Sequence, residues 1–230
     1  MSVVSAPFRS RVRAGVEPIA RVFGRVGLTP NALTVIGLII AIIGAYLVAN
    51  HYWLIGALVV GLGAIFDLFD GALARATGKV SRFGAFLDST LDRVGEAVVF
   101  LGIAWAFVDV VPNVTLGVLF TMAAAFMVSY TRARSESLGF APGASMASVG
   151  MASREVRMTI LILGLLAAGL WPVLDRDWCH LPPCEIALGD GGRWLTLALA
   201  MIAFLSVIST IQRILFTYNQ SRSQNQEVTK

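Results

Sequence analysis

The strongest constraint on this chain is a series of apolar segments, each long enough to cross a lipid bilayer. Residues 31–50 contain no charged side chain, and a membrane-spanning helix needs about 20 apolar residues. Only 14% of all residues are charged, whereas a soluble domain carries roughly 25%. The mean hydropathy is +0.76. We therefore predict an all-α, polytopic membrane protein.

Short polar connections divide the sequence into six predicted spans. These spans cover residues 31–50, 54–76, 83–107, 114–136, 152–171 and 193–217. Pro30 suits the first turn of the first span, with Thr29 as its N-cap. The predicted organisation is an amphipathic juxtamembrane helix at 1–28, a six-helix domain at 29–218 and a polar tail at 219–230, for which we expect disorder.

The first 28 residues mix arginines with apolar side chains, a combination typical of a helix lying on an anionic membrane surface. A solvated basic tail is the alternative. No compact apolar stretch followed by a small-residue cleavage site occurs here, so no signal peptide is predicted.

Basic residues are distributed unevenly between the two sides of the predicted bundle. With six spans and both termini on one side, every Lys and Arg except Arg176 and Arg193 falls on that side. Cytoplasmic loops are enriched in Lys and Arg, so we expect the termini on the cytoplasmic side of the cell membrane. The same clustering at span ends argues against nucleic-acid binding, although the net charge is +4.

The predicted extracytoplasmic loop at 172–192 contains Cys179 and Cys184. In an oxidising compartment these two residues either form a disulfide or remain free thiols. A metal site at His180 lacks enough ligands.

Four aspartates lie in or at the edge of the second and third spans. Asp67 and Asp70 are three residues apart on one helix. Asp88 and Asp92 are four apart on the next, so each pair shares a helix face. A charged residue at the centre of a membrane helix costs about 3 kcal/mol, so we expect something to compensate these carboxylates. If the two helices face each other, the carboxylates converge on a site that suits a hard cation such as Mg²⁺.

The full pattern reads Asp67-x-x-Asp70-Gly71-x-x-Ala74-Arg75, eight residues, then Gly84-x-x-x-Asp88-x-x-x-Asp92. It resembles the signature of the CDP-alcohol phosphotransferase family and matches every fixed position of that motif. The six-helix layout and the amphipathic N-terminal segment are also similar. The resemblance implies an enzyme that transfers a phosphatidyl-type group from a CDP-diacylglycerol-type lipid to an alcohol and releases CMP.

The resemblance also implies roles for individual residues. Two divalent ions, Mg²⁺ or Mn²⁺, would be held by Asp67, Asp70, Asp88 and Asp92. One ion would use the first three of these aspartates, and the second would use Asp67, Asp88 and Asp92. Asp92 would be the catalytic general base. The nucleotide would be bound by Thr29, Pro30, Asn31, Ala32, Gly71, Ala74, Arg75, Ser81 and Gly84. A homodimer is expected from the same resemblance.

The motif residues also allow a reading that does not depend on the family. Small residues beside carboxylates let a ligand approach a helix closely, and an arginine offers a forked donor for phosphate. Each glycine taken singly is more typical of helix packing through small residues, and only the whole set favours a binding site. Arg93 and Glu96 are expected to orient or pack neighbouring groups.

Arginines at the cytoplasmic ends of the last three spans indicate an anionic acceptor, because guanidinium groups bind phosphate in a bidentate manner. The stretches 129–136, 154–157 and 212–213 resemble those of the phosphatidylinositol-phosphate synthase branch of the family. Glu155 and Val156 replace a proline and a glutamate of that branch. By this resemblance Arg132, Arg157 and Arg213 would bind the phosphate of a phosphorylated polyol, inositol phosphate.

Other functions remain compatible with the sequence. The same chemistry could use glycerol 3-phosphate, or a neutral alcohol such as inositol or serine, as the acceptor. An ion or metal transporter is the alternative from another class, because intramembrane carboxylates also mark ion paths. The nearly apolar outer halves of the first three spans argue against a continuous polar path.

Overall fold

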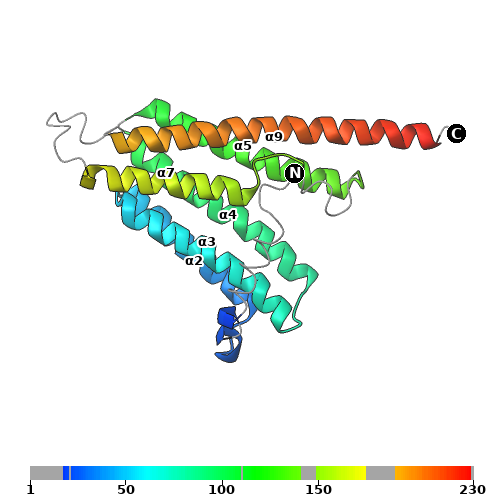
Figure 1. Cartoon of the computed structure of the whole chain (residues 1–230), viewed down its shortest axis with the longest axis horizontal. Helices are drawn as coiled ribbons and strands as arrows, with labels where there is room; N and C mark the ends of the chain where they lie inside the picture. Colours follow the sequence, from blue (N-terminus) through cyan, green and yellow to red (C-terminus); the bar gives the residue numbers. More distant parts are fainter. Residues whose placement is uncertain (1–17, 21, 110, 141–148, 175–189, 229–230) are drawn as a thin grey trace.

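The computed structural model describes residues 18–20, 22–109, 111–140, 149–174 and 190–228. The long helices in this part of the chain are α2 (Pro30–Ala49), α3 (Trp53–Ala76), α4 (Arg82–Phe107), α5 (Pro112–Ser137), α7 (Arg154–Leu174) and α9 (Asp190–Val228) (Figure 1). No strand occurs among the described residues. The predicted all-α class is confirmed.

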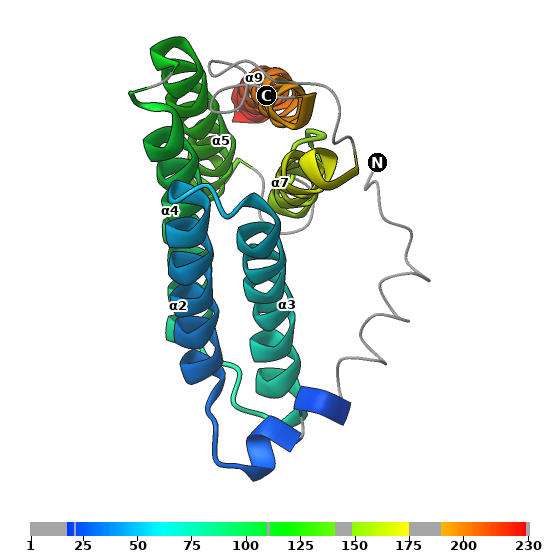
Figure 2. The same cartoon turned by 90° about the vertical axis from the view of Figure 1, so that its left-hand side faces the viewer.

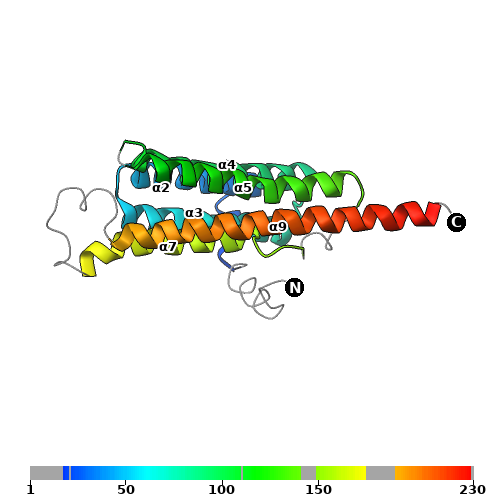
Figure 3. The ribbon, with the colours of Figure 1, turned by 90° about the horizontal axis from the view of Figure 1, so that it is seen from above.

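The helices form a ring in which the main contacts of each are with two neighbours. The order around the ring is α2, α3, α7, α9, α5 and α4, which returns to α2 (Figure 2). Helices that follow one another in the chain run in opposite directions, so the ring neighbours α5 and α9, like α2 and α4, are parallel (Figure 1). The C-terminal ends of α3 and α5 therefore lie at the same end of the bundle as the N-terminal ends of α4 and α7 (Figures 1 and 3).

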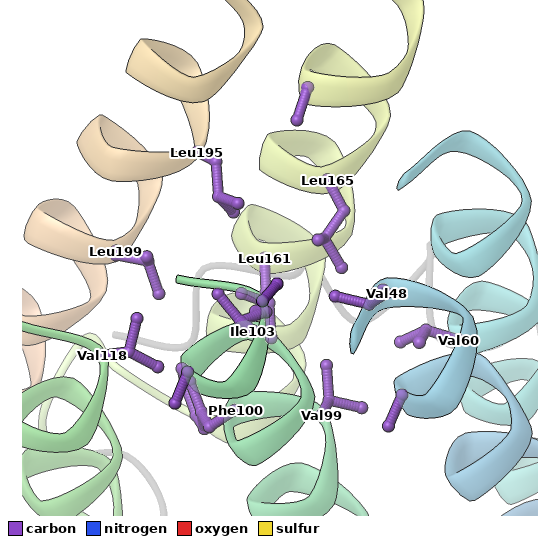
Figure 4. Packing of buried hydrophobic residues seen from close by; sticks show 14 of the residues in the cluster. Val48, Val60, Val99, Phe100, Ile103, Val118, Leu161, Leu165, Leu195 and Leu199 are labelled. Carbon is purple, nitrogen blue, oxygen red and sulfur yellow. The ribbon is translucent and has the colours of Figure 1, made fainter. Parts of the chain in front are cut away.

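A hydrophobic core at the centre of the ring receives side chains from all six helices. Its fully buried members include Val48, Val60, Phe100, Leu161, Leu165 and Leu195 (Figure 4). Glycines bring α2 and α3 close together. A Cβ on Gly44 would lie 2.7 Å from Val60, and a Cβ on Gly56 would lie 2.7 Å from Val48. Close backbone approach through small residues is how membrane helices pack.

The outer surface of every long helix carries exposed apolar side chains. Examples are Ile39, Leu58, Trp105, Phe120, Leu163 and Phe204. By length and composition, α2, α3, α5 and the Gly192–Ser223 part of α9 are able to cross a membrane. These features support the predicted membrane protein. The charged residues of α4 lie between Arg82 and Glu96, those of α7 lie in its first turn, and the prediction of six spans stays a prediction.

The segment before α2 packs against the end of α3 rather than standing apart from the bundle. Ala20 is buried, and the ring of Phe23 lies 5.4 Å from that of Phe69. Residues 18–20 and 22–25 are helical. Residues 1–17 lie outside the described part of the chain, so the predicted surface helix at 1–28 stays a prediction.

The expected disorder of the 219–230 tail is wrong as far as Val228, because α9 continues to that residue. The segment contains neither glycine nor proline after Gly192, so nothing in it interrupts helical hydrogen bonding. Cys179 and Cys184 lie outside the described residues, and the disulfide stays a prediction.

Candidate active site

A cavity of about 270 Å³ lies between the start of α2, the end of α3 and the start of α4. Most of the predicted nucleotide-binding residues line it, namely Pro30, Asn31, Gly71, Ala74, Arg75, Ser81 and Gly84. Asp70 and Asp88 line the same cavity, together with Lys79, which the motif does not include. Residues far apart in the chain thus meet at one space, as the motif predicts.

Thr29 and Ala32 do not line this cavity, but they fix its edge. Thr29 Oγ1 accepts a hydrogen bond from the Ala32 amide at 3.2 Å and so caps α2. Ser81 Oγ accepts from the Gly84 amide at 2.9 Å and caps α4. The N-termini of both helices therefore lie beside the cavity, and helix N-termini favour anionic groups.

Two motif glycines leave room that a side chain would fill. A Cβ on Gly84 would lie 3.0 Å from Ser81 Oγ and 3.3 Å from Asn31 Oδ1. A Cβ on Gly71 would lie 3.2 Å from the Arg75 guanidinium. The missing side chains allow Arg75 to lie over the helix and keep the cavity open.

Asp67 and Asp92 line a second, smaller pocket of about 20 Å³ between α2, α3, α4 and α7. Gly37 of α2 lies against Asp67, since a Cβ there would be 2.9 Å from Asp67 Oδ1. Thr34 lines both spaces and donates from Oγ1 to Asp70 Oδ2 at 2.7 Å. Sequence reasoning missed Thr34 and Gly37. Their spacing of three residues on the helix that faces the motif was the available signal.

Arg154, at the start of α7, connects the two aspartates of the smaller pocket. Its Nη2 donates to Asp67 Oδ2 at 2.7 Å, and its Nη1 lies 2.8 Å from Asp92 Oδ1. Asp92 is also within electrostatic range of Asp67 and Asp88. Arg154 compensates part of the charge that the sequence places at membrane depth.

The predicted three-aspartate ligand sets are not assembled in the structure. Among the described residues, no three His, Cys, Asp or Glu side chains are close enough to hold a metal ion. The reason is the division of the carboxylates between two adjacent spaces, with Arg154 between Asp67 and Asp92. The donor chemistry still suits a hard divalent cation. Asp92 Oδ1 is buried and has no hydrogen-bond partner besides its contact with Arg154.

Arg157 forms a buried bidentate pair with Glu96. The Nε–Oε1 and Nη2–Oε2 distances are both 2.8 Å, and Nη1 donates to the Ala152 carbonyl at 2.8 Å. Both side chains are only 2% exposed. All three guanidinium nitrogens are engaged, which opposes the prediction that Arg157 binds the acceptor phosphate. The expected packing role of Glu96 agrees with this pair.

Arg213 and Ser209 of α9 hold the segment that leads into α7. Arg213 donates from Nε to the Val149 carbonyl at 3.0 Å and from Nη1 to the Val128 carbonyl. Ser209 Oγ accepts from the amides of Met151 and Ala152 at 3.0 and 2.9 Å. Arg213 thus has a structural role, and its contact with the acceptor phosphate stays a prediction.

Arg132 is the most exposed of the three predicted acceptor arginines. Its Nε donates to Glu136 Oε1 at 2.9 Å, and its side chain is 46% exposed. It lies within electrostatic range of Arg213. These two arginines therefore gather at the end of the bundle that carries the aspartates.

Comparison with known proteins identifies the family. Residues 27–218 match the CDP-alcohol phosphatidyltransferase family. The chain belongs to this family. It is therefore a phospholipid-type transferase, as the aspartate motif predicts.

Two relatives of this CDP-alcohol phosphatidyltransferase are named as inositol phosphate lipid synthases. It is 38% identical to an archaetidylinositol phosphate synthase of Pyrococcus horikoshii over 175 residues, 74% of this chain and 88% of that one. It is 32% identical to a phosphatidylinositol phosphate synthase of Mycolicibacterium smegmatis over 203 residues, 86% of this chain and 81% of that one.

Two solved structures resemble this transferase. One is the crystal structure of Mycobacterium tuberculosis phosphatidylinositol phosphate synthase with CDP-DAG bound, at TM-score 0.70 and 31% identity, covering 88% of this chain and 93% of that one. The other is the same enzyme in complex with manganese and citrate, at TM-score 0.71 and 29% identity, covering 88% of each chain.

Proposed function

We propose that this transferase moves a phosphatidyl-type group from a CDP-activated lipid to a hydroxyl of inositol phosphate and releases CMP. The observation that carries the proposal is the cavity in which the motif's arginine, glycines and two of its aspartates meet beside two helix N-termini. The names of the relatives support the acceptor, and the CDP-DAG complex of the M. tuberculosis enzyme supports the donor.

In the proposed reaction the larger cavity binds the CDP moiety. Arg75 and the N-termini of α2 and α4 bind the diphosphate. Asp67, Asp70, Asp88 and Asp92 would hold divalent ions, Mg²⁺ or Mn²⁺, which would neutralise charge on the phosphoryl group and on CMP. The manganese complex of the similar enzyme supports this assignment.

Asp92 is the proposed general base. It accepts the proton of the acceptor hydroxyl as the hydroxyl oxygen forms a bond to the lipid-side phosphorus. The bond between that phosphorus and the CMP oxygen breaks, and CMP leaves with the electron pair. Asp92 suits this role because it lies on α4, one turn from Asp88 of the larger cavity. It also lies 3.8 Å from Arg93, which is within electrostatic range of Arg213.

Arg132 and Arg213 are the proposed ligands of the acceptor phosphate, and we add Arg93 to them. Arg93 Nη1 is buried without a hydrogen-bond partner and lies 3.8 Å from Asp92 Oδ2. A guanidinium nitrogen without a partner beside the base suits an incoming anion. The site and the termini would face the cytoplasm, and a homodimer remains part of the proposal.

In the decisive experiment, the purified full chain in nanodiscs receives CDP-diacylglycerol, Mg²⁺ and a labelled alcohol, and the label in the lipid fraction is measured. We expect lipid-soluble label from inositol phosphate. Label from glycerol 3-phosphate, inositol or serine instead would overturn the acceptor. An absence of lipid label with every alcohol, also when CDP-archaeol is the donor, would overturn the reaction. Asp92→Asn should reduce turnover by about 10²–10⁴-fold while CDP binding is retained.

A further inference from the structure

The smaller pocket contains a cation supplied by the chain itself. Arg154 contacts Asp67 Oδ2 at 2.7 Å and Asp92 Oδ1 at 2.8 Å. Its side chain is 21% exposed, and those of the two aspartates are 18% and 15% exposed. The guanidinium is thus shared between two helices, since Asp67 belongs to α3 and Asp92 to α4.

A metal ion held by the same two aspartates would need the same oxygen atoms. Divalent cations bind carboxylate oxygens at about 2.0–2.6 Å, a shorter distance than the guanidinium contacts. A guanidinium and a metal ion cannot both contact the same two carboxylate oxygens, since they need the same space. The two cations would also repel each other. Arg154 must therefore leave these oxygens when an ion takes them.

The contacts of Arg154 with the rest of the chain suit such an exchange. Its Nε is buried without a hydrogen-bond partner, so within the described part of the chain its guanidinium is held by the two aspartates. Arg157, three residues later, differs because its guanidinium also holds the Ala152 carbonyl and is buried with Glu96. Arg157 is thus held by a backbone carbonyl and a fully buried carboxylate. The Arg154 guanidinium contacts the two partly exposed aspartates of the smaller pocket.

We propose that Arg154 is an exchangeable internal counter-ion of the metal site. It neutralises Asp67 and Asp92 when no ion is bound, holds α3, α4 and α7 together, and competes with divalent ions for the two carboxylates. This inference rests on the proposed function, because it takes the aspartates as metal ligands.

Mn²⁺ binding to the purified full chain tests the competition directly. Titration calorimetry or the electron paramagnetic resonance signal of free Mn²⁺ gives the Kd without any turnover. We expect Arg154→Gln to bind Mn²⁺ about tenfold more tightly than the wild type, equivalent to about 1.4 kcal/mol. Arg154→Lys keeps the charge but has no fork to bridge two carboxylates, so its Kd should fall between the two. Arg134→Gln removes an exposed charge elsewhere and serves as the control.

Thermal unfolding separates an exchangeable counter-ion from a purely structural arginine. In EDTA, Arg154→Gln should unfold at a lower temperature than the wild type, because Asp67 and Asp92 repel each other without their partner. In saturating Mn²⁺ that difference should disappear, since the ion replaces the guanidinium in both proteins. An equal loss of Tm in both conditions would overturn the inference, as would an unchanged or weaker Mn²⁺ affinity.

Two further variants show which idea has failed. If Asp67→Asn and Asp92→Asn both bind Mn²⁺ as the wild type does, the proposed metal ligands are wrong and the inference falls with them. If these variants lose Mn²⁺ binding while Arg154→Gln gains none, the metal site stands and the exchange alone is refuted. If Arg154→Gln does not fold, Arg154→Lys decides the question, and an unchanged Kd in that variant counts against competition.

Discussion

Replacement of Glu96 by Gln tests whether Arg157 serves the fold or the acceptor. The Glu96 carboxylate receives two guanidinium hydrogen bonds of 2.8 Å, and both side chains are 2% exposed. Charge-assisted hydrogen bonds contribute about 1.5–3 kcal/mol each, and removal of one partner of a buried pair costs about 3–5 kcal/mol. Because Gln retains one acceptor, we expect Glu96→Gln to lower the free energy of unfolding by about 3 kcal/mol.

Unfolding of the purified protein in mixed micelles, followed by circular dichroism during SDS titration, measures this loss. Arg157→Gln should be destabilised to a similar extent. The double variant should lose clearly less than the sum of the two, because the second change removes the stranded charge. Glu136→Gln is the matched control. It breaks the exposed pair with Arg132 and should cost at most about 0.5 kcal/mol.

Acceptor kinetics of the same variants complete the test. If Arg157 acts through the fold, Glu96→Gln and Arg157→Gln should change the KM for the acceptor to a similar degree. If Glu96→Gln keeps wild-type stability and only Arg157→Gln raises that KM, the structural role assigned to Arg157 is refuted.

Three further substitutions address the cavity and the aspartates. Gly84→Val should raise the KM for the CDP-lipid at least about tenfold, because the side chain meets Ser81 Oγ within about 3.0 Å, and nucleotide binding by calorimetry checks this. Gly37→Ala should displace the Asp67 carboxylate, which lies 2.9 Å from the new Cβ, and should weaken Mn²⁺ binding measured by titration. Thr34→Val should lower kcat and cost about 1.5–3 kcal/mol of stability, because Asp70 loses a 2.7 Å hydrogen bond.

Matched controls exist for these substitutions. Gly117→Val changes a helical glycine whose added Cβ meets nothing within 4 Å, so nucleotide and metal binding should stay unchanged. Thr159→Val changes an exposed threonine that donates to the Glu155 carbonyl of its own helix. If the controls and the site variants behave alike, the cavity has no special role in binding.

The helix ends at the larger cavity could be predicted from the sequence because local chemistry determines them. Thr29 and Ser81 have the side chains that cap helices, and Pro30 follows the first of them. The i,i+3 and i,i+4 spacing likewise places each aspartate pair on one helix face. These features depend on residues that are near each other in the chain.

The partners of the arginines could not be predicted, because they depend on how distant helices pack. Arg154 and Arg157 are neighbours in the sequence, yet one bonds Asp67, 87 residues away, and the other bonds Glu96, 61 residues away. The length of α9 escaped prediction for a different reason. A polar composition suggests disorder, although no residue in the segment interrupts a helix.

The hydrogen bonds of Ser209 and Arg213 to residues 149–152 bear on the order in which the enzyme folds during synthesis. Chains are synthesised from the N-terminus, so α2, α3 and α4 can associate while the last helix is still within the ribosome. Val149, Met151 and Ala152, which surround Gly150 at φ +94°, have hydrogen-bonding partners on that last helix. A nascent chain can therefore assemble the larger cavity, which α2, α3 and α4 line, before α9 is complete. The segment that leads into α7, and with it Arg154, obtains its hydrogen-bonding partners only when α9 has been made.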